Sequence, residues 1–249
     1  MRRNHTILTA AVSAALISPA AVAQVDTSDW KCEYCPFDKG YRAEYDVGAS
    51  SVSDEAWRYG NGTGYDDKGA YAEVGGEGRY FNEGTEVTWN AEDLGLDSRV
   101  FTMSAGKPGR FEVDLGYRGL PYRLFNTTST VYDFTGETAT RPSTWTPAGS
   151  TAGFADLSAS LQPVEIGLDR DVLSFGLSYL PTQNLGAFIN YSRQERDGIR
   201  IATGSDFTQA AYFPRVIDDY NDQVDVGIDI DIGSMDLSLA YYGSFYGNK

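Results

Sequence analysis

From Gly40 onward the sequence alternates between apolar and polar residues. A period of two is typical of β-strands that present one apolar face and one polar face. The alternation is sharpest between residues 224 and 232, where valine and isoleucine alternate with aspartate and glycine. The pattern predicts nine strands, over residues 40–48, 68–81, 85–92, 98–105, 110–118, 163–180, 185–197, 222–232 and 235–245.

The lengths of these segments and their connections distinguish two fold classes. A soluble β-sandwich also alternates, because one side of each strand faces water. A tilted strand that crosses a bilayer needs about nine to eleven residues, and most of these segments are near that length or longer. Short connections at 82–84, 106–109, 181–184 and 233–234 alternate with mostly longer ones at 49–67, 119–162 and 198–221, and only the short connection at 93–97 breaks this pattern. The sequence therefore predicts an all-β fold, an antiparallel transmembrane β-barrel of the outer-membrane type.

The predicted strand count indicates that residues 40–249 are only the N-terminal part of a larger barrel. Bacterial single-chain barrels have an even number of strands, and short turns lie on their periplasmic side. Nine strands starting from the periplasm would leave the C-terminus outside. The last residues, Gly247-Asn248-Lys249, also lack the terminal aromatic residue expected on a closing strand.

The N-terminus has the features of a secretory signal. Arg2 and Arg3 precede a mostly apolar stretch, and Ala21-Val22-Ala23 forms a cleavage site. We expect residues 1–23 to be removed and residues 24–39 to form a periplasmic segment. No later stretch approaches the roughly 20 apolar residues of a transmembrane helix. The predicted location is the outer membrane.

Charge and histidine content exclude several classes of function. The full chain has 20 Lys+Arg and 35 Asp+Glu. The signal carries two of the basic residues and no acidic ones, which leaves 18 − 35 = −17 for the mature chain. Such a charge does not favour nucleic acid as a partner. The single histidine, His5, lies in the signal, so the mature chain is predicted to have no histidine base, metal ligand or catalytic triad. We expect a protein that is not an enzyme.

The only two cysteines, Cys32 and Cys35, form a C-x-x-C motif shortly after the signal. Pro36 follows, which excludes the C-x-x-C-H motif of covalent haem attachment. A thioredoxin-like site needs a βαβ context, and a zinc site needs four ligands. The motif leaves three alternatives: a local disulfide, a redox or assembly role, and metal binding shared with another chain.

Aspartates cluster near the end of the chain, and they raise the alternative of a calcium site. Their spacing does not match an EF-hand loop, and period-two placement explains most of them as lumen-facing or loop residues. Tyrosine and tryptophan near predicted strand ends fit the aromatic girdles of a membrane barrel. The clustered aspartates are Asp218, Asp219, Asp222, Asp225, Asp229, Asp231 and Asp236. The aromatic residues near strand ends are Tyr41, Trp89, Tyr117, Tyr179 and Tyr191.

Three stretches resemble the MtrB/PioB-type outer-membrane porins of bacterial porin–cytochrome electron conduits. The first contains the cysteine motif, and the other two run along predicted strands and turns. The first is Trp30-Lys31-Cys32-Glu33-Tyr34-Cys35. The second is residues 105–111, which run into Gly116-Tyr117-Arg118. The third begins at residues 181–184 and continues through 190–198, and the ending at 239–245 agrees with the same family. The resemblance implies a large barrel that encloses a periplasmic multihaem c-type cytochrome and passes electrons across the outer membrane. An outer-surface multihaem cytochrome or a mineral would be the further partner, and the haems would belong to the partner cytochrome.

In that arrangement one face of each strand contacts the cytochrome. We expect six carboxylates to point into the lumen, toward basic patches of the partner or toward water: Glu86, Glu112, Asp114, Asp225, Asp229 and Asp231. Two other functions remain open. One is a general diffusion channel for small solutes, and the other is a periplasmic thiol oxidoreductase that uses Cys32 and Cys35.

Overall fold

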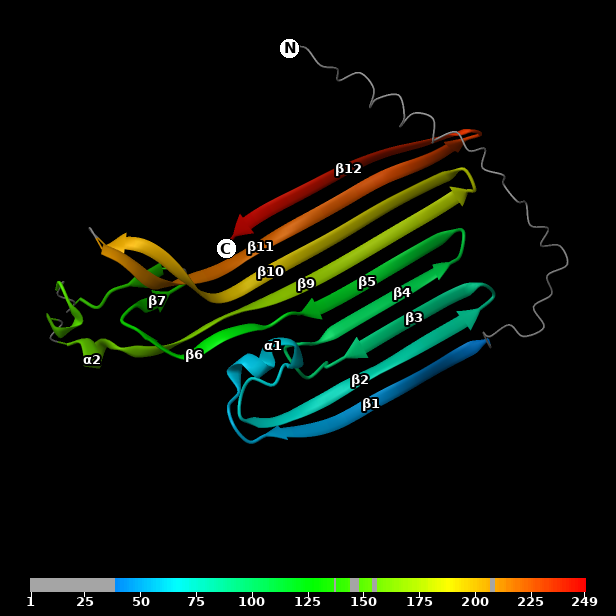
Figure 1. The fold of residues 1–249 in the computed structure, drawn as a ribbon. Helices are drawn as coiled ribbons and strands as arrows, with labels where there is room; N and C mark the ends of the chain where they lie inside the picture. The colour runs from blue at the N-terminus through cyan, green and yellow to red at the C-terminus, as the bar shows by residue number, and fades with distance from the viewer. Residues whose placement is uncertain (1–38, 137, 144–147, 154–155, 207–208) are drawn as a thin grey trace, which may run out of the picture. The chain divides into compact units, whose positions relative to one another are not determined.

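The computed structural model describes residues 39–136, 138–143, 148–153, 156–206 and 209–249. One antiparallel sheet dominates this part of the chain (Figure 1). Nine of its strands pair in chain order: β1 (Gly40–Val52), β2 (Gly69–Asn82), β3 (Thr85–Glu92), β4 (Val100–Lys107), β5 (Phe111–Gly119), β9 (Gln162–Thr182), β10 (Leu185–Asp206), β11 (Gln209–Ile232) and β12 (Met235–Asn248). These nine strands coincide within a few residues with the predicted ones, except that β10 and β11 are longer, and the all-β antiparallel fold is confirmed.

Two expected loops contain strands, and there the prediction was wrong. Residues 119–162 include β6 (Tyr122–Thr130), which pairs with β9, and the small hairpin of β7 (Asp133–Thr135) and β8 (Thr138–Thr140). β6 follows β5 after a break at Pro121, which has no N–H to donate. Residues 198–221 are mostly strand, because β10 and β11 continue through them. In these regions the apolar alternation that revealed the other strands is weak.

The sheet has two different ends, which we name the turn end and the loop end. At the turn end lie the short connections 83–84, 108–110, 183–184 and 233–234. At the loop end lie the connections 53–68, 93–99 and 120–161, and the first of these contains the short helical turns η1 (Trp57–Tyr59) and α1 (Gly60–Thr63). The connection 120–161 contains the short helical turns η2 (Thr151–Gly153) and α2 (Leu157–Ser160). Figure 1 shows the short turns together at one end of the sheet and α1 and β6 toward the other.

One face of the sheet, which we name the apolar face, carries large hydrophobic side chains on every one of the nine strands. Cross-strand pairs such as Trp89 with Met103 and Ile228 with Leu239 place these residues opposite one another. Many are exposed, and Leu239 is 67% exposed. Residues that define this face include Tyr41, Tyr45, Val47, Val74, Val87, Trp89, Phe101, Met103, Val113, Leu115, Phe175, Leu177, Ile189, Tyr191, Val226, Ile228, Leu237 and Leu239.

The apolar face ends abruptly toward the loop end. Arg193 of β10 lies opposite Leu173 and Asp222, and Asp222 lies opposite Phe245. From Met235 to Phe245 the apolar-face positions of β12 are uncharged, a length of about 34 Å along an extended strand. At the tilt of about 45° usual in barrels, this length gives a band about 25 Å tall, which matches the apolar band of outer-membrane barrels.

Aromatic rings cover glycines across neighbouring strands and help to fix the register. A Cβ atom added to Gly78 of β2 would lie 2.2 Å from Nε1 of Trp89 on β3. On the opposite face of the sheet, a Cβ atom on Gly227 would lie 2.5 Å from the ring of Phe188. Such ring-over-glycine pairs recover packing that a glycine alone cannot supply in a strand.

The described part of the chain contains no helix that is both long and apolar enough to cross a membrane. The predicted signal peptide and the cysteine pair, Cys32 and Cys35, lie outside the described residues. The three alternatives for that pair therefore stay predictions.

Candidate functional site

The face opposite the apolar face carries mainly charged and polar side chains, and we name it the polar face. Pairing registers put Arg42 beside Arg79, Glu44 beside Glu77, and Ser104 beside Asp114. On β1 to β5 the polar face also includes Asp46, Glu73, Glu86, Thr88, Asn90, Glu92, Thr102, Glu112 and Arg118. Carboxylates outnumber arginines in this set, so the polar face is acidic over these strands.

All six carboxylates predicted to face the lumen lie on the polar face. The pairs Glu86 with Gly106 and Gly106 with Glu112 place the first two on it. Asp114 follows on β5, and the register of β9, β10 and β11 extends the same face to Asp225, Asp229 and Asp231. Val226 and Ile228 point to the other side. That these carboxylates meet a partner is still a prediction.

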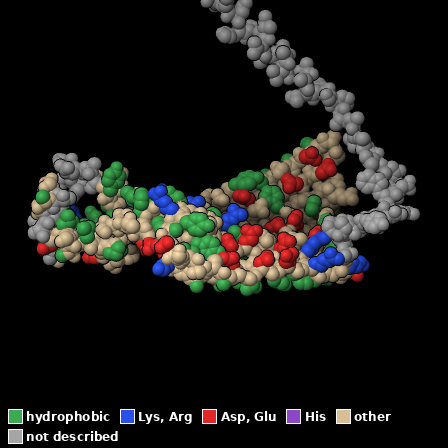
Figure 2. Space-filling view, turned by 60° about the horizontal axis from the view of Figure 1, so that its bottom comes forward, with side chains coloured by type: hydrophobic (Ala, Val, Ile, Leu, Met, Phe, Trp, Pro, Cys, Tyr) green, Lys and Arg blue, Asp and Glu red, His purple; other side chains and the backbone are tan. Residues whose placement is uncertain are grey.

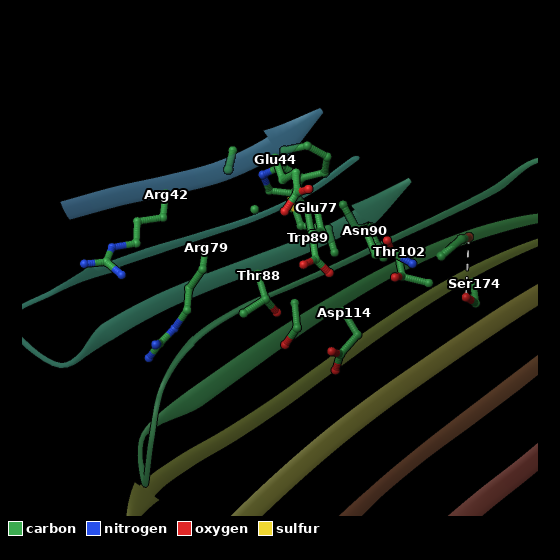
Figure 3. A pocket seen from close by; sticks show the side chains of 16 residues that line it. Arg42, Glu44, Glu77, Arg79, Thr88, Trp89, Asn90, Thr102, Asp114 and Ser174 are labelled. Atoms are coloured by element: carbon green, nitrogen blue, oxygen red, sulfur yellow. Dashed lines mark hydrogen bonds between the residues drawn. The ribbon is translucent and has the colours of Figure 1, made fainter. Parts of the chain in front are cut away.

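The polar face is hollowed over β1 to β5 and β9. One depression has a volume of about 780 Å³, and Figure 3 shows side chains from several strands around it, including Arg42, Arg79, Glu77, Asn90 and Asp114. A second depression of about 580 Å³ lies beside it, and a third of about 350 Å³ lies nearer the turn end. Figure 2 shows acidic side chains gathered on the hollowed face and hydrophobic ones along its lower margin.

Hydrogen bonds and ion pairs hold part of the polar face in place. Arg79 Nε lies 2.7 Å from Glu86 Oε1 across β2 and β3. The Ser104 hydroxyl donates to Glu112 Oε1 at 3.2 Å. These contacts leave the carboxylates accessible to another surface, because Glu86 and Glu112 are only partly buried or exposed.

Sequence reasoning missed several carboxylates of this face. Glu73 and Glu77 of β2 and Asp46 of β1 line the second depression, with Glu44 and Glu92. Glycines at 75, 76 and 78 interrupt the apolar alternation of β2, so the sequence alone gave no reason to choose its glutamates. The pairing of β2 with β1 is the signal that places them.

No group of His, Cys, Asp or Glu side chains in the described part of the chain is arranged to hold a metal ion. The aspartates between residues 218 and 236 are divided between the two faces. Asp219, Asp225, Asp229 and Asp231 lie on the polar face, whereas Asp218 and Asp222 lie on the other. Asp236, which pairs with Asp231, also lies on the polar face, so only Asp218 and Asp222 are separated from the other aspartates of the calcium site raised as an alternative.

An apolar band about as tall as a bilayer on one face and a hollowed polar surface on the other define the wall of a transmembrane β-barrel. The chain belongs to the MtrB/PioB family of outer membrane beta-barrel porins, because the family model matches residues 52–249. The location in the outer membrane and the partial barrel expected from the sequence agree with this family. It is a family of porins rather than a class of enzymes.

A relative is the "Outer membrane protein MtrB" of Shewanella baltica (strain OS185), which is 27% identical over 237 residues. The match covers 94% of this chain and 34% of the relative. The chain therefore spans about a third of the length of the curated relative that it matches, which agrees with an open sheet that forms part of a larger barrel.

Proposed function

We propose that this chain forms part of a sheath that encloses a periplasmic multihaem c-type cytochrome and supports electron transfer across the outer membrane. The observation that carries the proposal is the acidic, hollowed polar face opposite a membrane-facing band. A basic surface on an enclosed protein would complement this face, because opposite charges across an interface favour the correct orientation.

The number of strands bears on whether the lumen is wide enough for a protein. Barrel diameter grows with strand number, and eight strands leave room only for side chains or one small ligand. Here nine strands pair in succession, and the described residues of β1 and β12 do not pair with each other. Barrels of about 16–18 strands leave an open channel and barrels of about 22 strands enclose a plug, so a folded protein inside requires many more strands than these nine.

In this proposal the chain insulates and positions the partner, and the partner carries the haems. The single histidine, His5, precedes the expected cleavage site, and Pro36 follows the cysteine motif. Neither a covalent haem site nor a histidine ligand for iron is therefore expected in residues 24–249. An outer-surface multihaem cytochrome would receive or donate the electrons.

Purification of the full-length protein tests this function. We expect the tagged protein, extracted in mild detergent, to retain a partner that stains for haem and shows the absorption of a c-type cytochrome. A tagged diffusion porin from the same membrane is the control and should be colourless. A colourless full-length protein that instead conducts small solutes in planar bilayers would support the general diffusion channel.

The soluble thiol oxidoreductase, the remaining alternative, requires a compact soluble domain. The outer-membrane family and the wide open sheet do not match that requirement.

A further inference from the structure

Arg123 of β6 lies at the loop end, where three connections of the sheet meet. Its Nε lies 2.7 Å from Asp66 Oδ2 in the β1–β2 connection. Its Nη2 lies 2.9 Å from Asp97 Oδ2 in the β3–β4 connection. Its Nη1 pairs with Asp169 of β9. One guanidinium thus joins carboxylates from parts of the chain that are far apart in sequence.

The guanidinium is enclosed as well as paired. The Arg123 side chain is 8% exposed, and its guanidinium carbon lies 5.2 Å from the centre of the Trp57 ring. Burial disfavours the charged form, but hydrogen bonds to Asp66 and Asp169 outweigh this effect and raise the pKa of Arg123. The planar five-donor fork of arginine can bind three acceptors at once, which a lysine ammonium cannot reproduce with the same geometry.

The backbone around Arg123 is held by the same connection that supplies Asp66. The Asn61 side-chain amide donates to the Arg123 carbonyl at 2.9 Å and accepts from the Arg123 N–H. Two residues along the chain from Asn61, Thr63 ends the helical turn, and Gly64 follows with φ +71°. A Cβ atom on Gly64 would lie 2.7 Å from Cβ of Leu96, which is 3% exposed. The β1–β2 and β3–β4 connections are therefore packed closely around the arginine.

We propose that Arg123 is a latch that holds these three connections together and so fixes the conformation of the loop end of this wall. The latch goes beyond the proposed function, because it requires no occupant of the lumen. It can form only after the connections have met, since its three carboxylates come from separate segments. Without the guanidinium the three carboxylates would repel one another, and the loop end would open while the paired strands stay in the membrane.

The test is limited proteolysis of the purified full-length protein in detergent, with Arg123→Gln compared with the unsubstituted protein. Loss of one partner from a buried ion pair strongly favours opening, and cleavage follows the population of the open form. We expect cleavage within residues 53–68 or 93–99 to become about 100-fold faster. The folded barrel, measured by its shifted migration in unheated gels, should persist. Unchanged cleavage with a folded barrel would overturn the proposal.

Arg58 provides the matched control, because it lies in the same connection and its Nε donates to the Leu124 carbonyl of β6 at 3.0 Å. Arg58→Gln should change cleavage by no more than about twofold, as for an ordinary surface substitution. If cleavage accelerates equally in both variants, the ion pairs with the three carboxylates do not protect the connections, and the latch proposal is overturned.

Two further variants keep the proposal testable if Arg123→Gln does not reach the membrane. Arg123→Lys keeps the charge and loses the fork, so its cleavage should be intermediate. Asp97→Asn removes a half-exposed partner and leaves Arg123 with two carboxylates, so a smaller acceleration is expected. If both variants are cleaved at the rate of the unsubstituted protein, the latch is wrong.

Discussion

A charge placed on the apolar face should destabilise the barrel strongly, and Ile228→Arg is the sharpest case. Ile228 lies between Ala187 of β10 and Leu239 of β12 and is 39% exposed. Along β11 it is four residues from Val224 and four from Ile232, the uncharged limits of the apolar face. It therefore lies about 13 Å along the strand from either limit, near the middle of the band.

The expected magnitude follows from this depth. Arginine on the lipid face of a barrel costs about 2–4 kcal/mol at the bilayer midplane and about 0–1 kcal/mol near the interfaces. For Ile228→Arg we expect a loss of about 2–4 kcal/mol in the free energy of unfolding, a factor of about 30 to 700 in the folding equilibrium. The assay is equilibrium unfolding of the full-length protein by denaturant in phospholipid vesicles.

The neighbouring residue supplies the control. Asp229 lies on the polar face, opposite Gly186 and Ser238, so Asp229→Arg places the same side chain at the same depth toward the lumen. Its cost should be within about 0.5 kcal/mol of zero, as for an exposed polar site. Equal losses for the two variants, or a loss only for Asp229→Arg, would refute the assignment of the two faces.

Two other predictions concern packing and charge. Gly78→Ala should lower the free energy of unfolding by about 1–3 kcal/mol, because the added Cβ would overlap the Trp89 indole. In the same unfolding assay, most of this loss should disappear when Gly78→Ala is combined with Trp89→Thr. Asp197→Asn should raise the melting temperature of the full-length protein in detergent at pH 7. The Asp197 side chain is exposed, but partial desolvation, followed by the charges of Asp218 and Asp169, raises its pKa, so ionisation in the folded state costs stability. This cost is absent below the unfolded pKa of about 3.9 and grows as the pH rises through the raised folded pKa; a gain of equal size at pH 3 and pH 7 would contradict it.

The strands that cross the apolar band could be predicted from the sequence because a bilayer on one side and polar surroundings on the other enforce strict alternation. Val226 and Asp225 show the reason: each must face its own environment. Beyond the band this constraint is lost, so β6 and the continuation of β10 through Ile201 carry no clear period.

The polar face could be predicted only in part. Asp229 and Glu112 follow from alternation within their own strands, whereas Glu77 is placed by the pairing of β2 with β1. The Arg123 cluster could not be predicted at all. It depends on contacts between segments separated by 26 to 57 residues, which no local pattern records.

The proposed function requires that the polar face contact an enclosed multihaem cytochrome. The most direct measurement is site-specific photo-crosslinking in whole cells, with a photoreactive amino acid placed in the full-length protein at Thr88 or at Val87. These neighbours lie on β3, with Thr88 beside the depression of the polar face that Arg79 and Asp114 also line, and Val87 on the apolar face. We predict a haem-staining crosslinked band from Thr88 and none from Val87. A haem-staining band from Val87 alone, or from neither position in a folded barrel, would contradict the account.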